Sequence, residues 1–237
     1  MPRFRSTRFA VGRSQTAVAS VNGKIRVVIA DDDIRMRTGI RELLELETDI
    51  EVVATTGDGA TAVEMTERLD PDVVLMDVRM PTMNGIEATR LIRTKPHSLV
   101  RVLVVTTFDL DDYVLGAVRA GASGFLLKDQ APEQLAEAVR TVAAGDGIVA
   151  PRATARLLEE LVGRTNPDRA HSTLTPREID VVMLIAAGMN NEAIAEAAGI
   201  TRATVKTHVS SILSKLGLTS RIQIVVWAYE QGWVTRS

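Results

Sequence analysis

Short apolar runs alternate with amphipathic stretches over the first two thirds of the chain. The runs IRVVIA, IEVVAT, DVVLMD, RVLVVTT and GFLLK start near residues 25, 50, 73, 101 and 124. Between them, apolar residues recur at helical spacing in the ranges 34–46, 59–69, 85–94, 111–121 and 132–144. Nearly continuous apolar strands that alternate with helices predict a parallel sheet covered on both faces. The predicted fold is therefore a doubly wound α/β unit of the (βα)5 type.

The rest of the chain has a mainly helical pattern. A helical stretch near 152–161 precedes GRTNPDRAHST, whose Gly, Asn, Pro and Ser residues are typical of a linker. Beyond it we predict a small all-α domain of four helices, near 176–187, 191–198, 201–215 and 220–231. The predicted organisation is a disordered basic tail (1–24), an α/β domain (25–146), a linker (147–172) and the helical domain (173–237).

Composition and charge narrow the class of protein. Among 237 residues, 46% are hydrophobic and 24% are charged, which is ordinary for a globular protein. The absence of cysteine excludes disulfides, thiol catalysis and cysteine-ligated metals. No apolar run approaches the roughly 18 residues of a membrane span. Residues 25–150 carry a net charge of −9, whereas residues 1–24 carry +5 and residues 151–172 and 173–237 carry +1 each, which indicates different roles for these segments.

Chemically reactive side chains follow the predicted strands at one edge of the sheet. These are Asp31 and Asp32 after the first strand, Asp77 at the third, Thr106 at the fourth and Lys128 at the fifth. The carboxyl ends of the strands form the ligand-binding edge of such a sheet, so we expect the five side chains to meet. Three adjacent carboxylates repel one another and favour a divalent cation with oxygen ligands, most simply Mg²⁺. A cation, an ammonium group and a hydroxyl together suit a phosphoryl group that a carboxylate attacks in line.

The motifs around these residues resemble one known family. IRVVIADDD, PDVVLMDVRMPTMNGIEATR, VVTTFD and AGASGFLLKD are similar to the receiver domain of two-component response regulators, over roughly residues 25–145. The resemblance implies that Asp77 accepts the phosphoryl group. It also implies that Mg²⁺ is held by Asp77, by Asp32 directly, by Asp31 through water and by the backbone carbonyl of Arg79.

The same resemblance assigns roles at the fourth and fifth strands and shows two departures. It implies that Thr106 and Lys128 contact phosphoryl oxygens and that Phe125 is the aromatic switch residue. Asp33 stands where relatives often carry a neutral polar residue or His, and we interpret it as the N-cap of the helix that starts at residue 34. Asp129 stands where many receivers have Pro, and a cis bond before a residue other than Pro is costly, so we expect none there.

The helix predicted near 201–216 has two different faces. An apolar face is formed by Val205, Val209, Ile212, Leu213 and Leu216. The opposite face is small and hydroxyl-bearing, with Ala203, Lys206, Thr207, Ser210, Ser211 and Ser214. Small side chains permit close approach to a major groove, although amphipathicity alone also suits a solvated helix. The preceding helix and the short connection at 199–201 give the spacing of a helix-turn-helix.

The last domain also resembles a known family. LTPREIDVVMLIAAGMNNEAIAEAAGITRATVKTHVSSILSKLGL is similar to the DNA-binding domain of LuxR-type regulators, over about residues 173–237. The resemblance implies base contacts by Lys206, Thr207 and Ser210, and phosphate contacts by Thr201, Arg202, Thr204 and Ser211. Glu178 in the first helix is typical of the family and also complements the helix dipole.

The last helix has an apolar stripe with two interpretations. It consists of Ile222, Val225, Val226 and Tyr229. The stripe suits pairing of two copies on adjacent half-sites, and it equally suits packing within the core of its own domain. The residues alone leave both open.

Together the two parts resemble the NarL/FixJ class of response regulators. The resemblance implies a cytoplasmic, phosphorylation-gated transcriptional regulator whose only catalysis is its own phosphotransfer and dephosphorylation. The implied partners are a sensor histidine kinase, double-stranded DNA with paired half-sites, RNA polymerase and, on activation, a second copy of the chain, with no membrane.

Three alternative functions are also compatible with the sequence. A ligand-gated regulator would need an apolar pocket lined by aromatic residues, but these are 3% of the chain. A Mg²⁺-dependent phosphohydrolase would leave the helix-turn-helix unexplained, and no cap for a substrate is evident in the sequence. A DNA-binding protein that uses the acidic pocket only for partner contacts is the third alternative.

Overall fold

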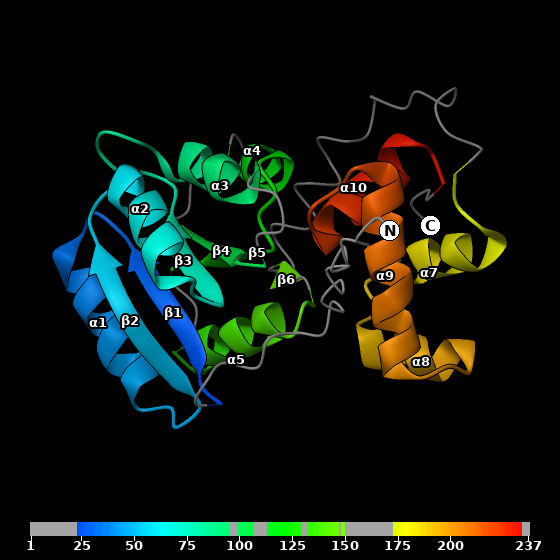
Figure 1. Ribbon diagram of the computed structural model, residues 1–237, viewed down its shortest axis with the longest axis horizontal. Coiled ribbons are helices and arrows are strands. Elements are labelled where there is room, and N and C mark those ends of the chain that lie inside the picture. Colours follow the sequence, from blue (N-terminus) through cyan, green and yellow to red (C-terminus); the bar gives the residue numbers. More distant parts are fainter. Residues whose placement is uncertain are drawn as a thin grey trace, which may run out of the picture.

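The structure is a computed structural model that describes residues 23–94, 99–106, 113–128, 132–146, 148–149 and 173–233. An α/β domain and a helical domain lie side by side (Figure 1). Most of the predicted basic tail, and the helix predicted near 152–161, lie outside the described residues. None of the helices in the described ranges is long and apolar enough to cross a membrane.

The described residues of the α/β domain form one parallel sheet in the order β2-β1-β3-β4-β5-β6. The strands are β1 (Ile25–Ala30), β2 (Ile50–Thr56), β3 (Val73–Asp77), β4 (Arg101–Thr106), β5 (Gly124–Leu127) and β6 (Ile148–Val149). The predicted parallel α/β fold and the starts of its five strands are confirmed. The short β6, which pairs with β5, is an addition that two apolar residues were too few to indicate.

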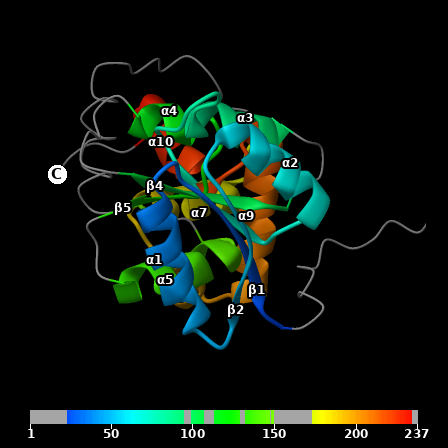
Figure 2. The same cartoon turned by 90° about the vertical axis from the view of Figure 1, so that its left-hand side faces the viewer.

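Five helices cover the two faces of the sheet. They are α1 (Ile34–Glu45), α2 (Gly59–Leu69), α3 (Gly85–Thr94), α4 (Val114–Arg119) and α5 (Pro132–Ala143). Successive strand residues point to opposite faces, so Val27 and Ile29 pack with α1 and α5, whereas Val28 and Ala30 pack with α2, α3 and α4. Figure 2 shows the sheet between these two layers. The nearly continuous apolar runs of the sequence therefore reflect burial on both faces.

Close backbone packing fixes the loop after β3. Gly85, the first residue of α3, donates its N–H to the carbonyl of Val78 at 2.9 Å. A Cβ atom at position 85 would lie 1.9 Å from the carbonyl oxygen of Asp77, and one at Gly59 would lie 2.5 Å from the carbonyl oxygen of Met83. Only glycine allows this approach, so α3 starts directly against the residue that ends β3.

The helical domain has four helices in the described residues. They are α7 (Pro176–Ala186), α8 (Asn191–Ala198), α9 (Arg202–Leu216) and α10 (Arg221–Glu230). The side chains of Thr175, Asn190 and Thr201 cap α7, α8 and α9. Gly199 and Gly217 end α8 and α9 in the left-handed conformation. These local signals explain why the predicted helix bounds are close to the observed ones.

Glu178 joins the first and third helices of this domain. Its carboxylate accepts hydrogen bonds from the Ser211 hydroxyl at 2.6 Å and from Lys215 Nζ at 2.7 Å, and it completes a capping box with Thr175. Burial raises the pKa of Glu178, but the bonds from Lys215, Ser211 and Thr175 outweigh that effect and lower the pKa to about 2. Glu178 is thus a structural anchor, a larger role than the expected complement to the helix dipole.

We expect Gly85→Ala to lower the free energy of unfolding by about 1–3 kcal/mol, because the new methyl group overlaps the carbonyl of Asp77. Gly39→Ala is the matched control: position 39 is an exposed site inside α1 with no atom within 4 Å of the added Cβ. The control should raise the free energy of unfolding by about 0.5–1 kcal/mol. Urea unfolding of the two variants measures both effects, and a neutral Gly85→Ala would contradict this packing.

We expect the contribution of Glu178 to stability to be present above pH 4.5 and to be lost as the pH falls toward 2. The reason is that its folded-state pKa of about 2 lies below the ordinary glutamate value of 4.5, so protonation favours the unfolded state. Glu178→Gln should lower the free energy of unfolding by about 1–3 kcal/mol at pH 7, with a smaller difference at pH 3. Tryptophan fluorescence reports on this domain, because Trp227 and Trp233 pack against its core. A pH-independent difference would contradict the assignment.

Candidate functional site

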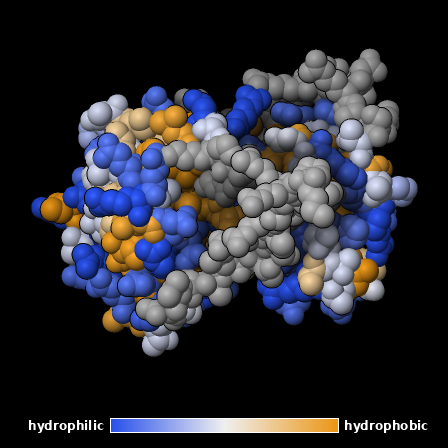
Figure 3. All heavy atoms as spheres, in the orientation of Figure 1, coloured by the Kyte–Doolittle hydropathy of each residue, from blue (hydrophilic) through white to orange (hydrophobic). Residues whose placement is uncertain are grey.

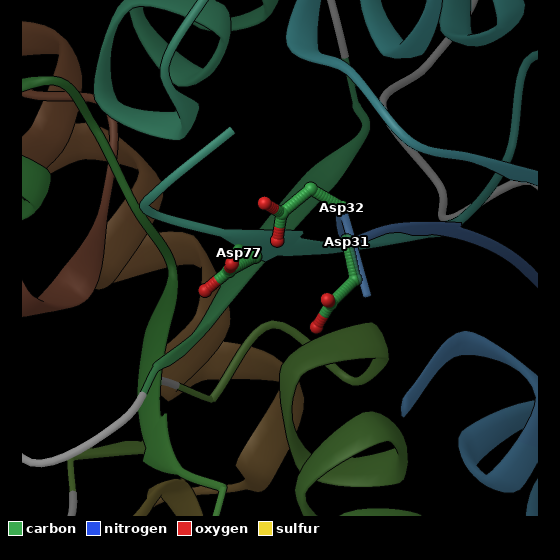
Figure 4. A group of neighbouring side chains, drawn as sticks. All are labelled: Asp31, Asp32 and Asp77. Atoms are coloured by element: carbon green, nitrogen blue, oxygen red, sulfur yellow. The ribbon is translucent and has the colours of Figure 1, made fainter. Parts of the chain in front are cut away.

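The ends of β1 and β3 bring three carboxylates together. Asp31 and Asp32 directly follow β1, and Asp77 is the last residue of β3. Each carboxylate has an oxygen within 4.8 Å of an oxygen of the other two. Asp31 and Asp77 are buried, whereas Asp32 is exposed, and the three side chains lie beside one another at the edge of the sheet (Figure 4). The expected convergence of these strand ends is present in the structure.

Lys128, which directly follows β5, lies beside this carboxylate cluster. Its Nζ lies 2.6 Å from Asp31 Oδ2 and 3.2 Å from Asp77 Oδ1. Its backbone N–H bonds to the carbonyl of Thr106 at 2.8 Å, which ties the end of β5 to the end of β4. The ammonium group therefore bridges the two buried carboxylates, and Asp32 lies within 4.8 Å of both of them.

The electrostatics of the site follow from burial and from these contacts. Burial raises the pKa of Asp77, Lys128 opposes the rise, and the charge of Asp31 adds to it. Burial lowers the pKa of Lys128, but its bond to Asp31 and its attraction to Asp77 outweigh burial, so the net pKa is raised. Lys128 is thus firmly charged, while Asp77 is a carboxylate that a cation or a proton would stabilise.

Hydrogen bonds with its neighbours orient Asp31. The N–H of Asp31 bonds to the carbonyl of Thr56 at 3.1 Å, and its Oδ1 accepts from the N–H of Asp33 at 2.9 Å. Arg37 of α1 donates to the carbonyl of Asp31. Asp33 caps α1 by accepting from Arg35 N at 2.8 Å, which is the role that the sequence indicated. Arg37 was missed, because one arginine on a predicted helix gives no signal of its target.

The remaining residues expected at the receiver site surround this cluster. Thr106 is buried at the end of β4, and Arg79 is exposed two residues after Asp77. Phe125 is fully buried in the cluster under α3 and α4. A hollow of about 580 Å³, lined in part by Asp32, Arg79 and Tyr113, opens beside the carboxylates.

The face of α9 that was expected to read DNA is open to solvent. Lys206, Thr207 and Ser210 are exposed, as are Thr201 and Arg202 at its start. The Thr201 hydroxyl caps the helix and lies 2.8 Å from the hydroxyl of Thr204. Ser211 is half-buried with its hydroxyl donated to Glu178. Its expected phosphate contact stays a prediction.

The apolar stripe of α10 is divided between the two domains. Ile222 and Val226 are buried in the cluster of the α/β domain that includes Phe125, and Tyr229 packs against it. Val225 packs instead against the core of its own domain. Gln223 Nε2 donates to the carbonyl of Val118 in α4 at 2.9 Å. The stripe therefore has a partner that neither sequence interpretation included.

A half-buried arginine and a close-packed glycine complete this contact. Arg93 of α3 donates to the carbonyl of Val100 at 2.5 Å and to the carbonyl of Thr219, before α10, at 2.6 Å. A Cβ at Gly121 would lie 2.6 Å from Thr219 Oγ1. Figure 3 shows apolar side chains on the side of the α/β domain that faces the helical domain. The two domains are packed together through specific polar bonds as well as apolar area.

Comparison with known families gives two matches. The family described as response regulator receiver domain matches residues 27–140. The family described as bacterial regulatory proteins, luxR family, matches residues 172–228. The first match contains the carboxylate cluster and Lys128, and the second contains the face of α9.

Similar proteins combine both parts in one chain. The transcriptional regulatory protein DegU of Brevibacillus brevis is 41% identical over 227 residues, which cover 89% of this chain and 95% of that protein. The nitrate/nitrite response regulator NarL of Escherichia coli K12 is 38% identical over 206 residues, covering 86% and 95%. The crystal structure of the response regulator ChrA of a heme-sensing two-component system is 35% identical, with a TM-score of 0.51 and coverage of 90% and 100%. The chain therefore belongs to the NarL/FixJ family of two-component response regulators, transcriptional regulators built from a receiver domain and a LuxR-type DNA-binding domain.

Proposed function

We propose that Asp77 is the phosphoryl acceptor of this response regulator and that a sensor histidine kinase is the donor. The observation that carries this proposal is the contact of Lys128 Nζ with both Asp31 and Asp77 beside a third carboxylate. Asp77 is the acidic residue of the three that ends a central strand, next to the hollow that opens beside Asp32. A donor can approach it from that side.

The donor set fits a magnesium ion. Three carboxylates within 4.8 Å of one another carry more negative charge than Lys128 balances, and hard oxygen ligands are those that Mg²⁺ prefers. Asp31, Asp32, Asp77 and the backbone carbonyl of Arg79 would hold the ion. When bound, it neutralises charge on the phosphoryl oxygens and on the carboxylates.

The transfer uses groups that are already in place. One carboxylate oxygen of Asp77 forms a bond to phosphorus while the phosphorus–nitrogen bond to the kinase histidine breaks, and the electron pair of that bond stays on the imidazole nitrogen. Lys128 then pairs with oxygens of the transferred group. Thr106 lies at the end of the neighbouring strand, at the same edge of the sheet. Its hydroxyl donates to another oxygen of the phosphoryl group.

The path from the site to the DNA-binding domain follows one packed cluster. Thr106 and Phe125 lie on the adjacent strands β4 and β5, and Phe125 shares its cluster with α4 and with Ile222 and Val226 of α10. Phosphorylation, by moving Thr106 and Phe125, shifts an existing equilibrium away from the packed arrangement. The shared cluster therefore links the phosphorylation site directly to helix α10 of the DNA-binding domain.

The released domain binds double-stranded DNA through α9. Lys206, Thr207 and Ser210 share its exposed face and read bases, while Thr201, Arg202, Thr204 and Ser211 stay candidates for phosphate contacts. We further propose that two copies bind paired half-sites, that RNA polymerase is a later partner, and that the protein acts in the cytoplasm. Among the described residues that line the hollow, Tyr113 is the one aromatic side chain, which does not favour ligand gating, and phosphohydrolysis would leave the helix-turn-helix unexplained.

We expect Asp77→Asn to abolish phosphoryl labelling by a phosphorylated kinase or by acetyl phosphate, because the amide lacks the nucleophilic carboxylate. Mass spectrometry of the intact chain measures the label. Asp33→Asn is the matched control, since asparagine caps a helix as well as aspartate does and Asp33 points its carboxylate at α1. The control should label like the wild type. Undiminished labelling of Asp77→Asn would reject the assignment.

We expect Lys206→Ala to weaken binding to the protein's own target duplex by about 1–3 kcal/mol, which is the usual value of a good base contact. Targets come from a genome-wide DNA pull-down with the wild type. Lys24→Ala removes the same charge from an exposed position directly before β1 and should leave affinity nearly unchanged. Fluorescence anisotropy measures both. Equal affinities of the two variants would contradict base reading by Lys206.

A further inference from the structure

The turn after α5 holds an acidic residue in a fixed position. Gly145 adopts the left-handed conformation, with φ of 86°. The N–H of Gly145 bonds to the carbonyl of Val142 at 2.9 Å, and the N–H of Asp146 bonds to the carbonyl of Thr141 at 3.1 Å. This is the bonding pattern of a helix C-terminal cap. The backbone of Asp146 is therefore set by the receiver domain itself.

The receiver domain does not explain why an acid stands there. Asp146 is 8% exposed, and within the described part of the structure its Oδ1 is buried with no hydrogen-bond partner. A buried acceptor without a partner costs free energy. The C-terminal end of a helix is also negative and disfavours a carboxylate. Asp146 therefore needs compensation from outside its own domain.

Two guanidinium groups of the DNA-binding domain supply positive charge for the Asp146 carboxylate. Asp146 Oδ2 lies 3.7 Å from Arg202 Nη2. Arg221 is buried, with bonds to Asn191 Oδ1 at 2.9 Å and to the carbonyl of Met189. Burial lowers the pKa of Arg221, and the charge of Asp146 opposes that shift. The acid of the receiver thus faces the cationic start of α9 and α10.

We infer that Asp146 occupies, at Arg202, the position that a DNA phosphate takes when the protein binds DNA. A carboxylate and a phosphodiester offer a guanidinium the same kind of anionic oxygen. Arg202 is the first residue of α9, and the receiver carboxylate and a DNA phosphate would compete for its guanidinium. The inference rests on the proposed function, since it takes Arg202 as a phosphate contact.

Because Arg202 is exposed, a DNA phosphate can readily replace the Asp146 carboxylate beside it. The Arg202 side chain is 53% exposed, whereas that of Asp146 is 10% exposed. An ion pair of this kind contributes little stability. The Asp146–Arg202 pair can therefore compete with DNA without preventing separation of the domains. The apolar contacts of α10 keep the domains together and so keep Asp146 beside Arg202. Asp146 therefore lowers the DNA affinity of the resting protein by a modest factor.

The experiment measures binding of the unphosphorylated full chain to a mixed-sequence duplex, because phosphate contacts do not depend on sequence. Asp146→Asn should bind about two- to fivefold more tightly than the wild type, with a smaller gain at high salt. Glu137→Gln removes the same charge from α5 at a side chain that is 68% exposed and within 3.9 Å of Arg140. This control should bind like the wild type. An unchanged affinity of Asp146→Asn, or an equal gain in Glu137→Gln, overturns the inference.

A second background separates this effect from a general loosening of the domains. In Arg202→Ala, the further change Asp146→Asn should give no gain, because the guanidinium that it frees is missing. A gain that persists in this background overturns the inference. Arg202→Ala alone, in protein activated with beryllofluoride, should weaken binding and reduce the salt slope by about 1. If it does not, the proposed phosphate contact fails as well. If it does while Asp146→Asn has no effect, the inference alone fails.

Discussion

The imbalance of charge at the carboxyl edge of the sheet is the constraint on which the structure of the receiver depends. Asp31, Asp32 and Asp77 gather in a space where Lys128 is the cation shown in contact with two of them. Mutual repulsion would separate these groups unless the backbone held them. The parallel strands, the cap of α1 and the glycine contact at the start of α3 all hold that edge. Stability of the fold and reactivity of the site are therefore coupled.

Local signals in the sequence predict most of the elements, because each signal has a physical cause that acts over a few residues. Capping side chains such as Asp33, Asp58 and Asn190 stand where helices begin. Strands buried on both faces give unbroken apolar runs. The strand ends that carry the acidic cluster follow from the same pattern, since parallel strands share an edge. Motif resemblance then assigns roles that spacing alone cannot.

Contacts between residues that are far apart along the chain could not be predicted from the sequence. Arg93 and Thr219 are 126 positions apart, and Asp146 meets Arg202 only because the domains pack in one particular way. The stripe on α10 was recognised as apolar, but apolarity does not identify the surface that covers it. Glu178 shows the same limit, since its partners on α9 lie 33 and 37 positions away. The type of a side chain predicts that it needs a hydrogen-bonding, ionic or packing partner, but it does not predict which residue that partner is.

Helix α4 has six residues, and Tyr113 at its start makes no capping bond through its side chain. So short a helix has little stability of its own, and the buried side chains of α10 lie against it. Separation of the domains would uncover apolar surface on both of them at once. Surfaces of that kind are covered again by association with another molecule, and association follows mass action. On the proposed mechanism, in which a second copy of the chain covers that surface, the response to phosphorylation would depend on the concentration of the protein.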